Sequence, residues 1–469
     1  MFTVIKKFLQ KRPLGLLLGL ATAAVLLIAP LPIAEDGRIC LAISLCVIVW
    51  WGFEVMPVGL SSCALLMGYS LFLNSETVQP QLIFKFWTMP MAYMVLSGFL
   101  IAGAIKHSGI GRRLALIFIS KFVKNYDQII FACYILSYLL SLIIPQSFAR
   151  AFLIMSVMSF IIEKTDMEKK YAINIGLAVF AAQNGAGLLF MTGDSSINML
   201  LLNLIPEAVR PGWLDWLWIM LVPALLLGVL TCGMQMLLVR GPKNLCIDVQ
   251  LARRELETMG PLSIKEKKTL FWLAVAVILW MTDSIHHVDV GWVSLAVAVL
   301  MAMPVIGDVI EQRDIAEINL GTLLFLNASM AIGMVGGATG MNQFLADLLC
   351  PKEISGGVMG LMLVVVLVCF GLHFLLGSVT AVITLALPAL FIVAEPMGVG
   401  IVPVAFAVYL ATIGQWFFPY QNISLTIGMG ENAGMYSVKE VAKLGFAFTI
   451  PAAAVVLISA VWWMIIGIV

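Results

Sequence analysis

Long apolar runs alternate along the chain with short polar interruptions, and two of these interruptions look alike. Residues 145–150 (PQSFAR) and 376–380 (LGSVT) each place small polar side chains between two apolar runs. A polar tip between two hydrophobic arms is typical of a hairpin that enters a membrane and turns back. The interval from Ser147 to Ser378 equals the interval from Gly109 to Gly340. This constant spacing predicts an internal repeat.

The apolar pattern predicts an all-α polytopic membrane protein with about 11 transmembrane helices plus two re-entrant hairpins in two inverted repeats. Each repeat is expected to contain one hairpin and one broken helix, meaning a span whose helix is interrupted inside the membrane. We expect an N-terminal helix at 1–36, a first repeat at 37–240 (hairpin 126–162, broken helix 171–204), a cytoplasmic linker at 241–268 and a second repeat at 269–469 (hairpin 354–394, broken helix 402–429). The remaining spans are predicted at 14–34, 39–55, 57–73, 88–106, 214–239, 269–283, 290–305, 321–339 and 441–468.

Composition supports the membrane class and excludes several functions. Hydrophobic residues make up 62% of the 469 residues and charged residues 11%, against roughly 25% charged in a soluble domain. A net charge of +1 gives no reason to expect a nucleic-acid partner. The eight cysteines show no C-x-x-C spacing and there are four histidines, so we expect neither a structural metal site nor a cofactor. The first helix is interpreted as a retained span because it lacks a small-residue cleavage site.

The distribution of basic residues predicts the orientation. Threading the spans alternately places 22 of the 27 Lys and Arg residues on one side, which is therefore expected to be cytoplasmic. The N-terminus would then be cytoplasmic and the C-terminus external, in an inner (plasma) membrane. Residues 109–124 are expected to form an interfacial helix with its Lys and Arg facing lipid head groups. Tryptophans are expected to sit in the interfacial belts: Trp213, Trp216, Trp218, Trp462 and Trp463.

Polar and flexible residues interrupt both broken helices. Residues 181–198 read AAQNGAGLLFMTGDSSIN, and residues 411–430 read ATIGQWFFPYQNISLTIGMG. Non-helical backbone at membrane depth persists only where it lines a cavity or is buried in protein. Half-helix N-termini then favour anions and freed carbonyls favour cations. Close packing of glycine-rich helices is the alternative interpretation.

Several stretches resemble one known family of transporters. Residues 50–57 (WWGFEVMP) resemble its early helix, and residues 97–115 resemble its fourth span and interfacial turn. The chain thus resembles the divalent anion/sodium symporter family, which carries di- and tricarboxylates and sulfate. The resemblance spans about residues 40–469. It implies a homodimer, with a scaffold domain and a transport domain that moves like an elevator.

The resemblance also places the site. The family has paired Ser-Asn-Thr motifs at its hairpin tips, which help bind sodium and substrate carboxylates. Here those positions read Ser147-Phe148-Ala149 and Ser378-Val379-Thr380, without either asparagine. A sodium site would therefore involve Ser147, Gly193, Ser378 and Thr380. The residues expected to bind substrate are Ser147, Arg150, Asn184, Gly193, Asp194, Ser195, Asn198, Ser378, Val379, Thr380, Pro419, Gln421 and Asn422.

Arg150 is the main departure from the family pattern, because a small residue is usual at that position of the tip. An arginine inside a membrane is costly unless it is paired or hydrated. Its guanidinium could hold a dianion bidentately, replace a sodium ion, or serve a structural role at the hairpin turn. Asp194 could pair with Arg150, bind a cation, accept a proton or remain hydrated. Two further residues each have two possible roles. Gln183 could line the cavity or satisfy unwound backbone, and His373 could sense pH or be structural.

These observations predict a secondary transporter of a small divalent anion, with dicarboxylates as the favoured class. Alternating access would occur with the anion held between the hairpin tips and the broken helices, and exchange, proton coupling and sodium coupling all stay open. The first alternative is a cation/proton antiporter with Asp194 as proton carrier, which would need no anion site. The second alternative is a membrane-embedded lipid-modifying enzyme, for which the sequence offers no nucleophile with a base. The expected partners are the small dianion and the lipid bilayer.

Overall fold

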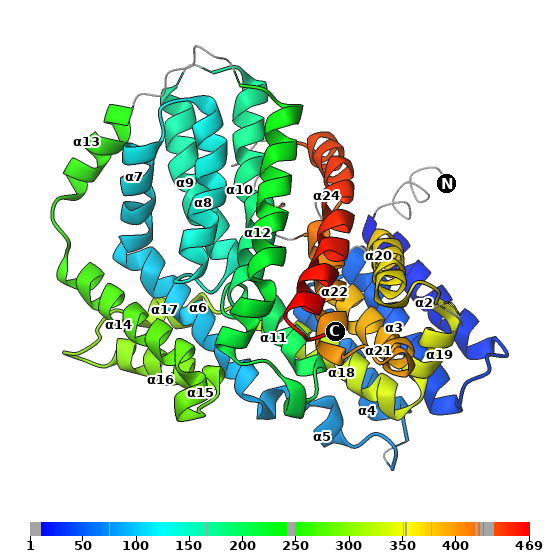
Figure 1. Cartoon of the computed structure of the whole chain (residues 1–469). Helices are drawn as coiled ribbons and strands as arrows, with labels where there is room; N and C mark the ends of the chain where they lie inside the picture. Colours follow the sequence, from blue (N-terminus) through cyan, green and yellow to red (C-terminus); the bar gives the residue numbers. More distant parts are fainter. Residues whose placement is uncertain are drawn as a thin grey trace, which may run out of the picture.

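The computed structural model describes residues 11–469 except 75, 166, 242–248, 350, 352–353, 377, 418–420, 423–424 and 426–435. The described part is helical (Figure 1). Before the linker the helices are α2 (Lys11–Ile28), α3 (Glu35–Gly52), α4 (Val58–Phe72), α5 (Pro80–Ile83), η1 (Lys85–Thr88), α6 (Pro90–Ser108), α7 (Ile110–Phe122), α8 (Tyr126–Ser141), α9 (Ser147–Lys164), α10 (Lys169–Leu189), α11 (Ser195–Leu204), η2 (Glu207–Val209) and α12 (Trp213–Leu238). After them come α13 (Val249–Met259), α14 (Ile264–Met281), α15 (Asp283–His286), α16 (Val290–Ala302), α17 (Gln312–Ala316), α18 (Leu320–Ala338), α19 (Met341–Leu349), α20 (Gly357–Leu376), α21 (Val379–Ala394), η3 (Glu395–Met397), α22 (Ile401–Gly414) and α24 (Val438–Ile465).

The order of helices before the linker recurs after it. The start residues of α3, α4, α6, α7, α8, α9 and α10 precede those of α14, α16, α18, α19, α20, α21 and α22 by a nearly constant interval. The turns agree in detail as well. Gly109, after α6, and Gly340, after α18, both adopt left-handed backbone, with φ of 83° and 78°. A residue with a side chain is strained in that left-handed conformation, so both turns favour glycine.

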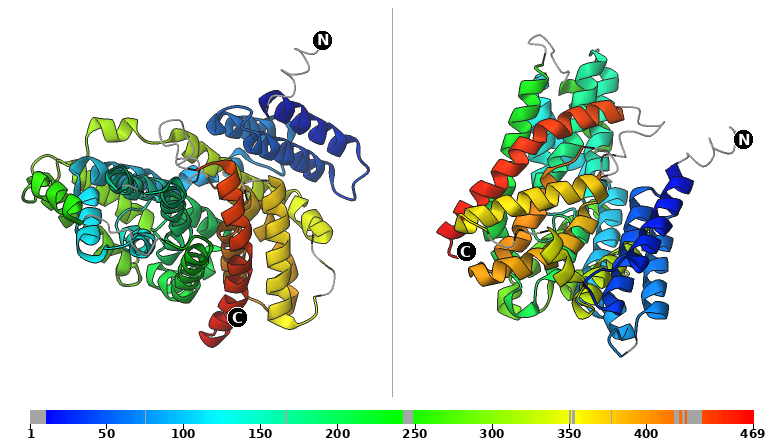
Figure 2. Two further views of the ribbon diagram at one scale, coloured as in Figure 1. Left: turned by 90° about the horizontal axis from the view of Figure 1, so that it is seen from above. Right: turned by 90° about the vertical axis from the view of Figure 1, so that its right-hand side faces the viewer.

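Contacts between the two halves follow the same correspondence. Helix α4 packs against α18, and their counterparts α16 and α6 pack against each other. Helix α3 contacts α19, and likewise α14 contacts α7. Helix α12 packs against its own counterpart α24, which lies between α12 and α20 when seen from above (Figure 2). Corresponding helices of the two halves thus have corresponding partners, as a pseudo-two-fold relation between two repeats would produce.

The helices occupy the predicted spans. Seven of the helices in the described residues are long and apolar enough to cross a membrane. Helices α8 and α9 lie where the first hairpin is predicted, α20 and α21 where the second is predicted, and α10 and α11 where the first broken helix is predicted. In the second broken helix, α22 ends at Gly414, and most of residues 418–429 lie outside the described residues. Helices α8, α9, α10 and α12 stand side by side in Figure 1.

A proline inside α12 leaves one carbonyl of that helix without its usual donor, and α24 supplies other donors. Pro223 has no N–H, so the carbonyl of Ile219 loses its helical donor. The indole nitrogens of Trp462 and Trp463 donate to that carbonyl over 3.2 and 3.1 Å. Neighbouring helices commonly supply such donors in membrane proteins, because no water is present to do so. Trp463 is fully buried, so it is not the interfacial residue that the sequence suggested.

The linker holds the two halves together through Arg113 on α7. Its Nε lies 2.6 Å from an oxygen of Glu266, and its Nη1 donates to the Gly260 carbonyl at 2.8 Å. Arg113 is 8% exposed, so the expectation that it faces lipid head groups is wrong. Nearby, Lys106 lies 2.9 Å from Glu317, and this hydrogen bond lowers the pKa of that carboxyl.

Candidate functional site

The tip of the first hairpin docks onto the break between α10 and α11. Gln146 donates from Nε2 to the Ser195 hydroxyl at 2.7 Å, and the Ser195 N–H donates to the Pro145 carbonyl at 3.0 Å. Helix α6 comes close because position 98 is glycine. A Cβ at Gly98 would lie 2.8 Å from Ser195 Oγ and 3.3 Å from Gln146 Nε2. Gly98 therefore allows the hairpin tip, the helix break and α6 to come into contact.

Arg150 is fully buried and its guanidinium is surrounded by oxygen atoms. Its Nε donates to Gln183 Oε1 at 2.6 Å, and its Nη2 donates to Ser147 Oγ at 3.0 Å. Its Nη1 donates to the carbonyls of Ile144 at 2.9 Å and Gly193 at 2.7 Å. Four of its five N–H donors are thus bonded to protein, and two of the four acceptors are main-chain carbonyls at the hairpin turn and the helix break.

Gln183 extends this network into the hairpin. Its Nε2 donates to the Ser137 hydroxyl and to the Val179 carbonyl, each at 2.9 Å. Gln183 is 2% exposed. The side chain thus joins α8, α9 and α10 and accepts from Arg150, which is neither of the two roles suggested by sequence.

Asp194 and Asn198 organise the break itself. Asp194 occupies the N-cap position of α11, where a negative charge is favoured by the helix dipole. Arg150 acts on it electrostatically, without a hydrogen bond or ion pair between the two side chains. Asn198 donates from Nδ2 to the carbonyls of Gly187, Phe190 and Met191 at 3.0 to 3.1 Å. It thereby satisfies carbonyls that the end of α10 leaves without helical donors.

Two tryptophans support the same break from outside. Trp216 donates from Nε1 to the Leu188 carbonyl at 2.9 Å, and Trp213 donates to the Thr192 hydroxyl at 3.3 Å. Both indoles are at most 1% exposed. The interpretation of Trp213 and Trp216 as interfacial residues is therefore wrong. Sequence could not reveal this, since a buried indole and an interfacial one have the same neighbours along the chain.

The second hairpin carries a different set of polar groups. At its tip the hydroxyls of Ser378 and Thr380 lie 3.1 Å apart, and Ser378 caps α21 by accepting from the Ala381 N–H. Just before the tip, His373 Nδ1 lies 3.1 Å from Gln415 Oε1. Gln421 Nε2 donates to the His373 carbonyl at 2.8 Å. The predicted site residue Pro419 lies outside the described residues.

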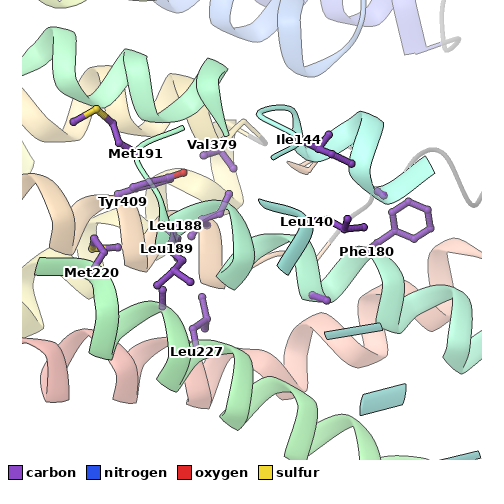
Figure 3. Packing of buried hydrophobic residues seen from close by; sticks show 14 of the residues in the cluster. Leu140, Ile144, Phe180, Leu188, Leu189, Met191, Met220, Leu227, Val379 and Tyr409 are labelled. Carbon is purple, nitrogen blue, oxygen red and sulfur yellow. The ribbon is translucent and has the colours of Figure 1, made fainter. Parts of the chain in front are cut away.

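Two hydrogen bonds connect the breaks of the two halves. Asn422 donates from Nδ2 to Asn184 Oδ1 at 2.8 Å, so two predicted site residues meet across 238 positions of sequence. The Tyr409 hydroxyl, on α22, donates to Asn198 Oδ1 at 2.5 Å. Tyr409 sits in an apolar helix, so no sequence signal pointed to it. Figure 3 shows it in the hydrophobic cluster that contains Leu188, Met191 and Val379 around the first break.

We use the term half-site for the polar groups at each hairpin tip and its neighbouring break; the hydrogen bonds of Asn422 with Asn184 and of Tyr409 with Asn198 join the two half-sites. Arg150, Ser195 and Asn198 are fully buried, and Thr380 is 8% exposed. None of them lines the large cavity of about 920 Å³, which lies between the start of α12 and the ends of α21 and α24.

A search of family models matches this chain to the sodium:sulfate symporter transmembrane region over residues 10–469. The chain belongs to the sodium:sulfate symporter family. This membership confirms the resemblance that residues 50–57 and 97–115 indicated. The protein is thus a polytopic transporter of a divalent-anion family, as the apolar spans and paired hairpins indicate.

Individual relatives agree with the family. A protein of Cupriavidus necator named membrane protein is 24% identical and covers 97% of this chain and 93% of its own length. The L-tartrate/succinate antiporter of Escherichia coli is 24% identical, covering 95% of this chain and 96% of its own. The crystal structure of the Alcanivorax borkumensis YdaH transporter aligns with a TM-score of 0.54 at 14% identity, covering 91% of this chain and 98% of that one. The last comparison supports the fold alone.

Proposed function

We propose that this protein is a secondary transporter of a small dicarboxylate, and that transport does not require sodium. The anion would be held between the tips at Ser147 and Ser378 and the two breaks. Alternating access would follow an elevator-type movement of a transport domain in a homodimer. The full-length similarity to L-tartrate/succinate antiporters supports a dicarboxylate substrate.

One observation supports the proposed independence of transport from sodium. The atoms around the Arg150 guanidinium are the Ser147 hydroxyl, the carbonyls of Ile144 and Gly193, and the Gln183 amide oxygen, at 2.6 to 3.0 Å. Such oxygens are the ligands that hard monovalent and divalent cations prefer. Two of the residues expected in a sodium site, Ser147 and Gly193, thus already bind a tethered cation. A fixed positive charge would do in the first half what a sodium ion would otherwise do.

The same contacts also limit how Arg150 meets substrate. With four of five donors bonded to protein, one Nη2 hydrogen remains for a further acceptor. Bidentate binding of a carboxylate by Arg150 would need the network to rearrange. We therefore assign Arg150 mainly to the positive potential of the site, and the tip hydroxyls and break amides to direct contact with the anion.

The alternatives are less well supported. A cation/proton antiporter would use Asp194 as proton carrier and would leave the buried guanidinium beside it without a role in the site. A lipid-modifying enzyme would need a nucleophile and base near the head groups, whereas the polar residues gathered here lie at buried hairpin tips.

A counterflow experiment in proteoliposomes tests the proposal. Vesicles are preloaded with unlabelled succinate, and uptake of labelled succinate is followed with sodium, potassium or choline as the external cation. We expect equal exchange in all three. Exchange that disappears without sodium would contradict sodium independence, and failure to exchange succinate, tartrate or sulfate would contradict dianion transport. An Arg112→Ala variant serves as control, because the Arg112 side chain is exposed and pairs with Glu255.

A further inference from the structure

The second half contains a buried imidazole where the first half contains the buried guanidinium network. We infer that His373 is a proton-binding site of the transport cycle, which takes up one proton together with the dianion and releases it with the dianion. This inference rests on the proposed function and deepens it, because it names the coupled ion.

In each half a glutamine bonds to a nitrogen of a hairpin side chain, although Arg150 lies on the second arm of its hairpin (α9) and His373 on the first arm (α20). Gln183 and Gln415 stand near the ends of α10 and α22, and the interval between them equals the interval between the first residues of these helices. Each glutamine offers its amide oxygen to a nitrogen of the neighbouring hairpin. In the first half the nitrogen is Arg150 Nε at 2.6 Å, and in the second it is His373 Nδ1 at 3.1 Å. The position that matches Arg150 by the interval between the hairpin tips is Ala381, which carries no charge.

The hydrogen bond assigns the proton on the neutral ring. An amide oxygen only accepts, so Nδ1 carries the hydrogen and Nε2 holds the free lone pair. Among the described residues Nε2 has no partner, although His373 is fully buried. A buried lone pair without a donor is unfavourable, and ionisable side chains inside membranes commonly mark proton or ion pathways. Nε2 is therefore the atom that would take the proton.

The elements around His373 leave its charge without a fixed counter-ion. Helix α20 packs against α21, α22, α24 and α3. Within α21 there is no ionisable residue, and no charged side chain among the described residues contributes to the electrostatics of the ring. The ionisable residues on the packed elements and on α20 itself are Cys369 on α20, Tyr409 on α22, Lys439, Glu440 and Lys443 on α24, Glu35, Asp36, Arg38, Cys40 and Cys46 on α3, and Glu54 after α3.

A bound dianion would be the missing counter-ion. Gln421, whose amide donates to the His373 carbonyl, is followed by Asn422, which bonds to Asn184 across the two breaks. His373 is thereby attached to the polar groups where the half-sites meet. The tethered guanidinium supplies one positive charge, and an imidazolium would supply a second. The imidazolium would add one positive charge to a site that already contains Arg150 and Asp194, so proton and anion would stabilise each other's binding.

Proton movement during succinate uptake by the wild-type protein tests the inference. Vesicles containing trapped pyranine are given an inward succinate gradient, with the membrane potential clamped at zero by valinomycin and equal potassium. We expect internal acidification of about one proton per succinate, and uptake that falls by up to roughly tenfold per pH unit on the alkaline side, as the protonated fraction falls. Succinate uptake without acidification, or counterflow without any net uptake, would overturn the inference.

A variant assigns the proton to His373. In His373→Asn the amide can still donate to Gln415 Oε1 but cannot take a proton. We expect acidification to be lost and the remaining succinate exchange to become independent of pH. His287→Asn, in an exposed turn, should behave as the wild type. Wild-type acidification in His373→Asn would overturn the assignment, and if that variant does not fold, His373→Gln replaces it. Loss of all dianion counterflow in the wild type would instead contradict the proposed function.

Discussion

Under the proposed sodium-independent function, replacing Arg150 by alanine should make the protein depend on sodium. The change removes the guanidinium but leaves its four oxygen acceptors: Ser147 Oγ, Gln183 Oε1 and the carbonyls of Ile144 and Gly193. Each buried acceptor without a donor costs about 1–3 kcal/mol. Because such losses are not additive, we expect a total loss of about 4 kcal/mol in sodium-free buffer, in the range for one partner removed from a buried charge network.

Sodium should recover part of that loss, because the vacated oxygens resemble a cation site. A ligand at about 30 times its dissociation constant stabilises the folded state by about 2 kcal/mol. Thermal unfolding followed by tryptophan fluorescence, in sodium chloride and in choline chloride at equal ionic strength, measures both effects. The wild type and the Arg112→Ala control should unfold at the same temperature in the two salts. Arg150→Ala with no greater stability in sodium than in choline would refute the idea that Arg150 occupies a cation site.

Two further predictions concern the packing of the first break. Gly98→Ala should lower stability by about 1–3 kcal/mol and slow exchange, because its Cβ would lie 2.8 Å from Ser195 Oγ. The control Gly233→Ala, whose Cβ would have nothing within 4 Å, should be neutral or stabilising. Equal stabilities of the two variants would contradict this account. Asn198→Ala should cost about 3 kcal/mol or more, because it strands three carbonyls and the Tyr409 hydroxyl. Tyr409→Phe removes a single bond and should cost about 1 kcal/mol, so chemical or thermal unfolding that ranks the two variants in the opposite order would be evidence against the proposed role of Asn198.

The positions of the helices could be predicted because hydrophobic periodicity and length act locally. A membrane span needs about 20 apolar residues, and a polar tip between two apolar arms can be read directly from the chain. The repeat was visible for the same reason, since Gly109 and Gly340 each meet a backbone requirement that only their own turn imposes. The locations of the hairpins and breaks, and Arg150 as an unusual residue at a tip, thus followed from sequence.

The partners of the buried polar groups could not be predicted, because they depend on which helices meet. Charge alone would pair Arg150 with Asp194, yet the fold surrounds the guanidinium with two carbonyls, a hydroxyl and the Gln183 amide. Tyr409 reaches Asn198 from a helix with no polar pattern of its own. Inside a membrane, where water is absent, polar groups depend on protein partners. Sequence therefore determined where polar atoms enter the membrane, and only the tertiary structure decided which of them satisfy one another.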